Sequence, residues 1–333
     1  MEGTQGSPAT DYEIRRLKAD DARQIPDLTE RVNGKGYLHA ELYHPDRLVR
    51  LNASGELIST VAVHHNDGAV VGHIALERPG LGPLAEAGEA MVLPEHQHHH
   101  LFERMKAFLD EEGRKAGLAG VFGNAVTFHI FSQRVEEREH SVPTSLMLGA
   151  SPAHAHRIAG DYPQRVSLLS YFKYLGGAGG TVVHLPERHR EIVARIYELL
   201  GRKLQFGTPE PPDGSGTLAI SYEPSIQRAL IRVDEPGQDS AAQIDESRRR
   251  LIATTAAEVI YLELPLDDPM SAGLCEEAEK IGFFFSGIAP QAVDSGDRLR
   301  LQLCKTPIDL SLLQIDGQFA HDLMAHIVAV RPK

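Results

Sequence analysis

The chain of 333 residues contains no tryptophan and two cysteines, Cys275 and Cys304. Two cysteines cannot form the disulfide framework of a small secreted domain, nor a zinc site built from cysteine. No apolar run approaches the ~20 residues that a membrane-spanning helix needs. The N-terminal segment MEGTQGSPATDYE is polar and lacks the apolar core of a signal peptide. We therefore expect a cytoplasmic protein that contacts no membrane.

Basic residues are in the minority, with 34 Lys and Arg against 46 Asp and Glu, and the formal net charge is −12. Such a surface repels phosphate backbones, so we expect no nucleic-acid partner. Hydrophobic residues make up 42% of the chain and charged residues 24%, a composition that excludes a wholly disordered or fibrous protein. At ~150 residues per domain, the length predicts about two domains.

Hydrophobic patterning predicts strands and helices in both halves of the chain. Two apolar runs, 57–64 and 69–76, flank the turn signal Asn66-Asp67-Gly68 and predict a β-hairpin. A further strand is expected at 88–93. Apolar residues at helical spacing then predict an amphipathic helix over about 100–116.

A glycine-rich stretch, Gly176–Gly180 (GGAGG), is the clearest linker in the chain, because such a run does not pack. A similar order of strands and helices is expected on both sides of it, as in an internal duplication. The sequence therefore predicts a disordered N-terminus at 1–10 and two domains, 11–175 and 181–333. The expected fold class is α/β, with a mixed, mostly antiparallel sheet flanked by helices in each domain.

Several stretches resemble a subgroup of GNAT acyltransferases that have two tandem domains. They are GELISTVAVHHNDGAVVGHIALE, the strand AMVLPEH with the following LFERMKAFLDEEGRKAGLAGVFGNAVTFHIFSQR, and the later block LPLDDPMSAGLCEEAEKIGFFFSGIAP. The resemblance covers most of the chain. It implies GNAT-like domains and the transfer of an acyl group from acetyl-CoA, or another acyl-CoA, to a small-molecule amine by direct attack. A homodimer is compatible with this resemblance.

The cofactor of that family carries a pyrophosphate, which the N-terminus of a helix can bind through backbone N–H groups. The family's loop has glycine or alanine at two positions, so that the backbone can approach the phosphates. In this chain the matching loop begins with Gln97 and has His100 and Phe102 at those two positions. The resemblance implies cofactor contacts by Met91, Val92, Leu93, Gln97, His98, His99, His100, Leu101 and Phe102.

The chain has 17 histidines, and four of them lie within residues 96–100. Three interpretations of this histidine run stay open. The run could be a solvated loop, or its imidazolium groups could contact an anion. Alternatively, His98 and His100, with Glu95 or His96, could bind a metal ion, although no recognised ligand spacing is present.

Glu89 is the first candidate for the general base of acyl transfer. It lies two residues before Met91, so the period of a strand places both side chains on one face. The resemblance implies that this face borders the gap between two central strands, where the thioester would lie. A base must reach the amine directly or through one water molecule. Glu86 is the second candidate.

On the next strand, Asn124 could contact the cofactor or orient a water molecule. The family's general acid is a tyrosine, whereas this chain has Phe131, so His129 is the candidate proton donor. These departures, with His100 in the loop, leave a second function open. It is a GNAT-shaped protein that has lost CoA binding and uses its histidines for another ligand, a metal ion or different chemistry.

In the second domain, the position of the pyrophosphate loop is occupied by an acidic segment, residues 234–243 (DEPGQDSAAQ). Its carboxylates would repel a pyrophosphate. We therefore expect this domain to bind no cofactor and to have a structural role, such as closing the substrate cleft or forming a dimer.

Overall fold

The computed structural model describes most of the chain, in two compact units. The predicted disordered N-terminus and His98 lie outside the described residues. The linker between two folding domains at Gly176–Gly180 stays a prediction. The described residues are 11–35, 37, 39–97, 99–155, 160–176, 179–211, 213–293 and 296–332. Of these, the first unit contains 11–123 and 174–176, and the second contains 124–155, 160–173 and 179–332.

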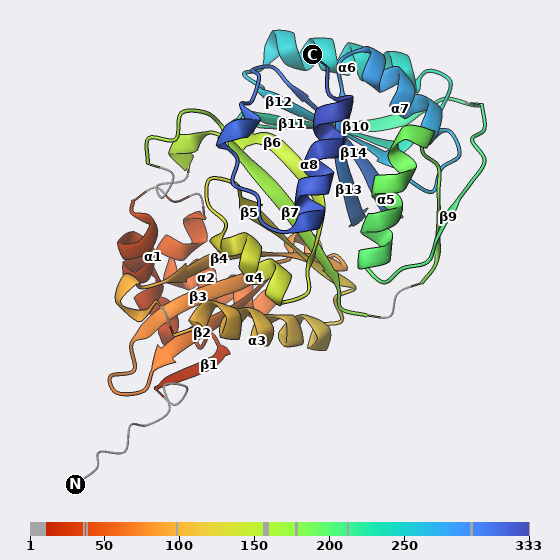
Figure 1. Ribbon diagram of the computed structural model, residues 1–333. Coiled ribbons are helices and arrows are strands. Elements are labelled where there is room, and N and C mark those ends of the chain that lie inside the picture. Colours follow the sequence, from red (N-terminus) through yellow and green to blue (C-terminus); the bar gives the residue numbers. More distant parts are fainter. Residues whose placement is uncertain are drawn as a thin grey trace. The chain divides into compact units, whose positions relative to one another are not determined.

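The first unit is built on a mixed sheet in which four strands are antiparallel neighbours and the fifth is parallel to the fourth. The predicted hairpin is confirmed, and the strand expected at 88–93 begins earlier, at Leu84. Across the sheet the order is β1 (Tyr12–Arg16), β2 (Leu57–His64), β3 (Val70–Glu77), β4 (Leu84–Val92) and β5 (Gly120–Val126), of which β5 continues into the second unit (Figure 1).

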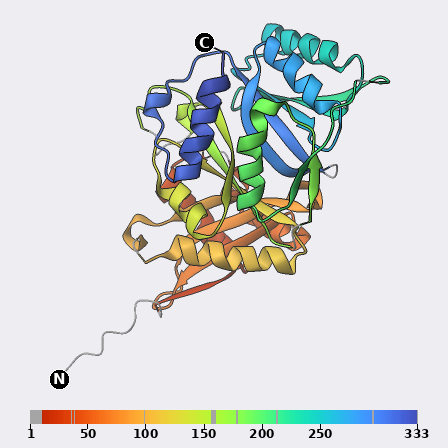
Figure 2. The ribbon, with the colours of Figure 1, turned by 45° about the vertical axis from the view of Figure 1, so that its right-hand side comes forward.

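Three helices cover this sheet: α1 (Ile25–Asn33), α2 (Pro45–Ser54) and α3 (Leu101–Lys115). The amphipathic helix predicted over 100–116 is α3, which lies across the strands in Figures 1 and 2. Its Met105 is fully buried, and a Cβ placed on Gly72 of β3 would lie 3.0 Å from the Met105 Cε atom. The apolar face of α3 therefore packs directly on the central strands, as its periodicity requires.

The second unit has a larger sheet, in which β11 and β12 are parallel and the other neighbours that pair are antiparallel. The expected class, mixed and mostly antiparallel sheets flanked by helices, is confirmed in both units. Across this sheet the order is β7 (Val166–Tyr174), β6 (Val142–Ser151), β13 (Phe284–Val293), β14 (Gly296–Cys304), β12 (Val259–Pro265), β11 (Arg228–Glu235) and β10 (Thr217–Glu223).

The described part of the second unit also contains a small parallel pair of strands and five α-helices, which Figure 1 labels along the chain. The pair is β8 (Thr181–Val183) with β9 (Leu204–Phe206). The helices are α4 (Phe131–Arg138), α5 (Glu187–Leu199), α6 (Ser240–Thr254), α7 (Ser271–Lys280) and α8 (Gln318–Val330).

Strands β6 and β13 of the larger sheet pair at a glycine. Gly287 of β13 pairs with Ser145 of β6, and its φ of 144° is a conformation that residues with side chains rarely adopt. A Cβ at this position would overlap the carbonyl oxygen of Thr144 and the Cα atom of Ser145. The two strands approach so closely that only glycine fits.

A buried histidine of α5 in the second unit contacts side chains of α7 and α8. His189 of α5 lies 2.8 Å from Glu279 Oε1 of α7 through Nε2, and 2.9 Å from the Nε2 atom of His326 in α8 through Nδ1. Its ring stacks on Phe285 at 4.7 Å. Burial, helped by the neighbouring His326, lowers the pKa of His189 to about 3, so the ring is neutral at pH 7.

This low pKa predicts a loss of stability in acid. The unfolded chain binds a proton at His189 below pH ~6.5, whereas the folded chain does not until about pH 3. Between pH 7 and pH 4.5 the folded state should therefore lose roughly 2–3 kcal/mol through this group. In urea unfolding at both pH values, the His189→Gln variant should show a pH-dependence that is smaller by about that amount. An unchanged pH-dependence would contradict the prediction.

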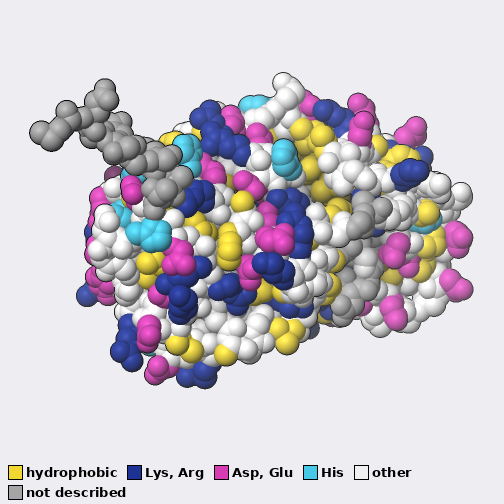
Figure 3. Space-filling view, turned by 90° about the horizontal axis from the view of Figure 1, so that it is seen from below, with side chains coloured by type: hydrophobic (Ala, Val, Ile, Leu, Met, Phe, Trp, Pro, Cys, Tyr) yellow, Lys and Arg dark blue, Asp and Glu magenta, His cyan; other side chains and the backbone are white. Residues whose placement is uncertain are grey.

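Charged side chains of both signs lie on the surface of the protein. Figure 3 shows one face of the molecule, on which acidic and basic side chains are interspersed and histidines lie among them. Within the described part of the chain, every helix is too short or too polar to cross a bilayer.

Candidate functional site

Strand β4 is interrupted by a β-bulge at Glu89. One residue of β3, Ile74, lies opposite two residues of β4, Glu89 and Ala90. Glu89 has a φ of 55°, in the left-handed region that is uncommon for a residue with a side chain. The bulge breaks the alternation from which a shared face with Met91 was predicted. Glu89 itself is buried, with 2% of its surface exposed.

The bulge lies beyond the point at which β4 stops pairing with its parallel neighbour. Three residues of β4, Leu84–Glu86, pair with Gly120–Phe122 of β5. Among the described residues, the pairing of β4 with β3 continues from there to Val92. In the part of the chain that the structure describes, the stretch of β4 that contains Glu89 therefore has a ladder partner on one side only.

Four side chains converge at the bulge, and we call them the Glu89 cluster: His39, Glu41, Glu77 and Glu89. The Nδ1 atom of His39 lies 3.5 Å from Glu41 Oε1 and 3.6 Å from an oxygen of both Glu77 and Glu89. One ligand atom from each residue lies within 4.8 Å of the others. The Glu89 side chain is 0% exposed, whereas the other three are partly exposed. The cluster is therefore open to solvent on one side and closed at Glu89.

A glycine makes room for this cluster. A Cβ on Gly88 would lie 2.5 Å from Glu77 Oε1, so the carboxylate of Glu77 occupies the space that a side chain would fill. Glu77 ends β3 and pairs across the ladder with Glu86. The register between β3 and β4 therefore brings the carboxylates of Glu77 and Glu86 together just before the bulge.

Burial and like charge control protonation in the cluster. Burial raises the pKa of Glu77 to about 7, and burial together with the neighbouring Glu77 and Glu41 raises the pKa of Glu89 well above its usual value. The adjacent His39 ring lowers the pKa of Glu41 to about 2. Burial acts to lower the pKa of His39, but Glu41 and Glu77 raise it above its usual value. The cluster therefore has more carboxyl groups than it can easily keep ionised.

His73 of β3 lies behind Glu89 and was not predicted from the sequence. It is fully buried, with Nδ1 at 3.3 Å from the backbone oxygen of Glu89 and 3.8 Å from Glu89 Oε2. Burial lowers the pKa of His73 to about 4, so the ring is neutral at pH 7. Its Nε2 atom is buried and has no hydrogen bond to any described residue. The one sequence signal was a histidine inside the apolar run AVVGHIAL.

The implied cofactor residues of β4 and α3 lie around the loop that joins these two elements. Met91 and Val92 pair with β3, and the Leu93 N–H group donates to the Val71 oxygen at 2.9 Å. Leu101 is buried and Phe102 packs against the same core. Their side chains are therefore committed to packing, and any contact of α3 with a pyrophosphate would come from its backbone.

His100 stands at the position where the family has glycine, and its backbone adopts the conformation that glycine favours. With φ 53° and ψ 30°, His100 is in the left-handed region immediately before α3. Its side chain is 76% exposed, with Nδ1 at 3.5 Å from Glu103 Oε1. The loop has thus kept a glycine-like turn with a histidine in it.

Two other histidines of the run, His96 and His99, pack against an aromatic ring. Tyr12 Oη lies 2.9 Å from His96 Nδ1, and the Tyr12 ring is 5.2 Å from that of His99. Burial lowers the pKa of His96. Gln97 donates a long hydrogen bond of 3.4 Å to the Val92 oxygen. Among the described residues, no member of the run belongs to a group of metal-ligand atoms. An anion contact stays a prediction.

Two further predicted site residues belong to the second unit. Asn124 accepts a hydrogen bond of 2.8 Å from Ser170 Oγ. The His129 ring lies between Phe128, at 4.8 Å, and Phe131, at 5.4 Å, and burial lowers its pKa. Their roles in catalysis stay predictions.

Carboxylates of the acidic segment 234–243 form hydrogen bonds and an ion pair with neighbouring groups of the same chain. Asp239 accepts hydrogen bonds from the Gly216 N–H group at 2.7 Å and from Ser215 Oγ at 2.8 Å. Asp234 pairs with Arg232 at 2.7 Å. These contacts fix the segment without a ligand, but the expected lack of a cofactor here remains a prediction.

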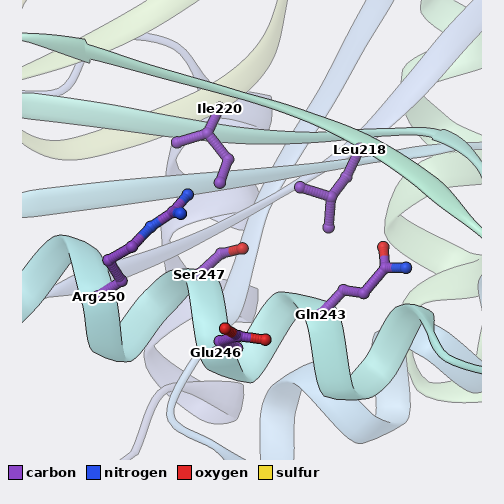
Figure 4. A pocket seen from close by; sticks show the side chains of 6 residues that line it. All are labelled: Leu218, Ile220, Gln243, Glu246, Ser247 and Arg250. Atoms are coloured by element: carbon purple, nitrogen blue, oxygen red, sulfur yellow. The ribbon is translucent and has the colours of Figure 1, made fainter.

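A hollow of about 410 Å³ also lies in the second unit, between β10 and α6 (Figure 4). Apolar side chains project into it from the strand, and polar ones from the helix. Of the described residues that line it, none belongs to a group of metal-ligand atoms and none was predicted to act in catalysis. Its lining residues are Leu218, Ile220, Gln243, Glu246, Ser247 and Arg250.

Comparison with known proteins adds a likeness of fold. No protein-family model and no curated protein matches the chain. Over about half its length, the chain resembles GNAT-family acetyltransferases of known structure. One from Desulfovibrio desulfuricans has 16% identity and a TM-score of 0.38, and covers 50% of this chain and 99% of its own. A Salmonella typhimurium acetyltransferase, solved with its cofactor acetyl-CoA, has 15% identity and a TM-score of 0.41, and covers 50% and 96%.

A third similar structure is the ribosomal-protein-S5-alanine acetyltransferase of Vibrio fischeri. It has 16% identity and a TM-score of 0.40, and covers 49% of this chain and 93% of its own. At such identities and TM-scores these likenesses establish neither the substrate nor the cofactor of this chain.

Proposed function

We propose that the chain is an acyl-CoA-dependent N-acyltransferase whose acyl group binds at the bulge of β4. The observation that supports this most is the position of the bulge. It lies where β4 has stopped pairing with β5, and a bulge leaves backbone groups outside the ladder, where they can bind a carbonyl oxygen. The strand then leads through a short loop into the N-terminus of α3.

The reaction would be a direct transfer to a small-molecule amine. The neutral amine nitrogen attacks the thioester carbonyl carbon, so that an N–C bond forms and the C–S bond breaks. The nitrogen loses a proton to the Glu89 carboxylate, directly or through one water molecule. The CoA thiolate takes a proton from solvent and leaves as a thiol.

The pyrophosphate of the cofactor would lie at the N-terminus of α3. Backbone N–H groups at the start of a helix bind phosphate, and the left-handed residue before them sets the approach of the chain. His100 provides that conformation at a cost, because an L-residue in the left-handed region is less stable than glycine by roughly 1 kcal/mol.

Calorimetric titration with acetyl-CoA tests this proposal. The wild-type chain should bind one equivalent, and His100→Gly should bind as tightly or more tightly, because glycine lets the backbone approach the phosphates. The variant should also gain about 1 kcal/mol in its free energy of unfolding.

His140→Gly is the matched control, because His140 also has a positive φ, of 60°, and lies outside the loop. It should gain similar stability and leave the affinity for acetyl-CoA unchanged. If neither the wild-type chain nor His100→Gly binds acetyl-CoA or another acyl-CoA, the proposal is wrong. The alternative function, a GNAT-shaped protein without CoA, would then be favoured.

A further inference from the structure

We propose that the Glu89 cluster binds one divalent transition-metal ion through His39, Glu41, Glu77 and Glu89. The proposal goes beyond acyl transfer, and the binding itself does not depend on that function. It also places the metal away from the histidine run, where the sequence suggested one.

The spacing of the four side chains fits a shared ion better than it fits hydrogen bonds. Bonds of about 2.1 Å from a metal to tetrahedral nitrogen and oxygen ligands place those atoms about 3.4 Å apart. The distances from His39 Nδ1 to the three carboxylates are 3.5, 3.6 and 3.6 Å. Hydrogen bonds between such groups are about 2.7–3.2 Å long. The ligand atoms of the three carboxylates lie within 4.8 Å of one another, so an ion bound to His39 would draw these carboxylates together.

A buried carboxyl group at the base of the cluster points to a missing partner. The side chain of Glu89 is 0% exposed, and neither of its oxygens accepts a hydrogen bond from any described residue. Buried carboxylates are normally paired, hydrogen-bonded or bound to a metal. The nearby nitrogens of His39 and His73, at 3.6 and 3.8 Å, are too distant to satisfy it. The neighbouring Glu41 carboxyl can share a hydrogen bond with Glu89 only when one of the two groups is protonated, and this contact contributes to the raised pKa of Glu89. A cation among the four ligands would.

The donor set indicates the class of metal. One imidazole nitrogen and three carboxylates suit Zn²⁺, Mn²⁺ or Fe²⁺, which accept both kinds of ligand. Mg²⁺ prefers an octahedral shell of oxygens with several waters, and soft ions prefer thiolates. The three carboxylates also provide the negative charge that a dication requires.

A second group of possible ligands, His189, Cys275 and Glu279 in the second unit, provides a contrast. Both nitrogens of His189 are already at hydrogen-bond distance, 2.8 and 2.9 Å, from Glu279 and His326. Burial raises the pKa of the Cys275 thiol to about 12, which disfavours the thiolate that binds metals. This group is therefore complete without an ion, whereas the Glu89 cluster is not.

The test is titration of the untagged, chelator-treated full chain with Zn²⁺ and with Mn²⁺, followed by calorimetry and by thermal unfolding. We expect one ion per chain and a rise in Tm of several degrees at saturation. His39→Ala and Glu77→Gln should each weaken binding by about 100-fold or more, because loss of an outer-shell partner alone costs about 10–100-fold.

The matched control removes one histidine and one glutamate from the run, in the double variant His96→Ala/Glu95→Gln. It should bind as the wild-type chain does. The proposal is overturned if no stoichiometric binding occurs, if binding survives His39→Ala and Glu77→Gln, or if the control loses it instead. Equal affinity for Mg²⁺ would overturn the assignment to a transition metal.

One consequence rests on the proposed acyl transfer. A metal-bound Glu89 carboxylate is not free to accept a proton, so saturating Zn²⁺ should inhibit transfer, and Glu77→Gln should relieve the inhibition. If the chain proves to have no transferase activity, this consequence fails but the titration still tests the site. If the titration fails, transfer by Glu89 is unaffected.

Discussion

The Glu89→Gln variant should lower kcat for acyl transfer by about 10²–10⁴-fold, which is the range that a positioned general base provides. Glutamine keeps the size of the side chain but cannot accept the proton of the amine. Binding of acetyl-CoA should change little, because the proposed cofactor contacts are backbone groups of β4 and α3. Steady-state kinetics with a panel of amines and calorimetry with acetyl-CoA separate the two effects.

Glu86→Gln is the comparison that distinguishes the two candidate carboxylates. Glu86 lies three residues earlier on β4, where the strand still pairs with β5. If Glu86→Gln causes the larger loss of kcat, Glu86 is the proton acceptor and our assignment is wrong. Thermal unfolding of both variants tests whether misfolding causes the loss of kcat. We expect Glu89→Gln to fold, because a neutral group of equal shape replaces the buried Glu89 carboxyl.

Gly287→Ala should destabilise the second unit by about 3 kcal/mol or more. The added methyl group would overlap the backbone of Thr144 and Ser145 in β6, and neither strand can move without breaking its neighbours' ladders. The positive φ of 144° adds strain to any residue with a Cβ. Urea unfolding followed by circular dichroism gives the free energy of unfolding directly.

Gly273→Ala is the opposite case in the same unit. Gly273 lies inside α7, and a Cβ there would meet no atom within 4 Å. Alanine should therefore stabilise the helix by about 0.5–1 kcal/mol. If Gly287→Ala is as stable as the wild-type chain, the close approach of β6 and β13 does not limit the fold as we argue.

Much of the first unit follows from local sequence. The hairpin of β2 and β3 was predicted because two apolar runs flank a turn signal, and α3 because its apolar residues recur at helical spacing. The start of β4 was not, because its first residues (LAEAG) have weak strand preference. Pairing with β3 and β5 determines that part of the strand, and such pairing is not visible locally.

The candidate site was predictable in part. Glu89 was selected from its position on β4, but the bulge that orients it depends on the register with β3. Glu77 could have been found from the register between β3 and β4, which places it opposite Glu86. Glu41 lies in a short 3-10 helix, Ala40–Tyr43, between α1 and α2, and His39 directly precedes this helix. Nothing in the sequence predicts the approach of these two residues to Glu89.

The pairing of β6 with β13 also determines when the second unit can form during synthesis. Ser145 and its partner Gly287 are 142 positions apart. At about 5–20 residues per second, the ribosome needs roughly 7–30 s to make the second strand after the first. During that time the buried residues of β6 lack this neighbour, and an unpaired strand edge is a site for aggregation. A nascent chain of this protein would therefore keep this edge of β6 unpaired until residue 287 has been translated.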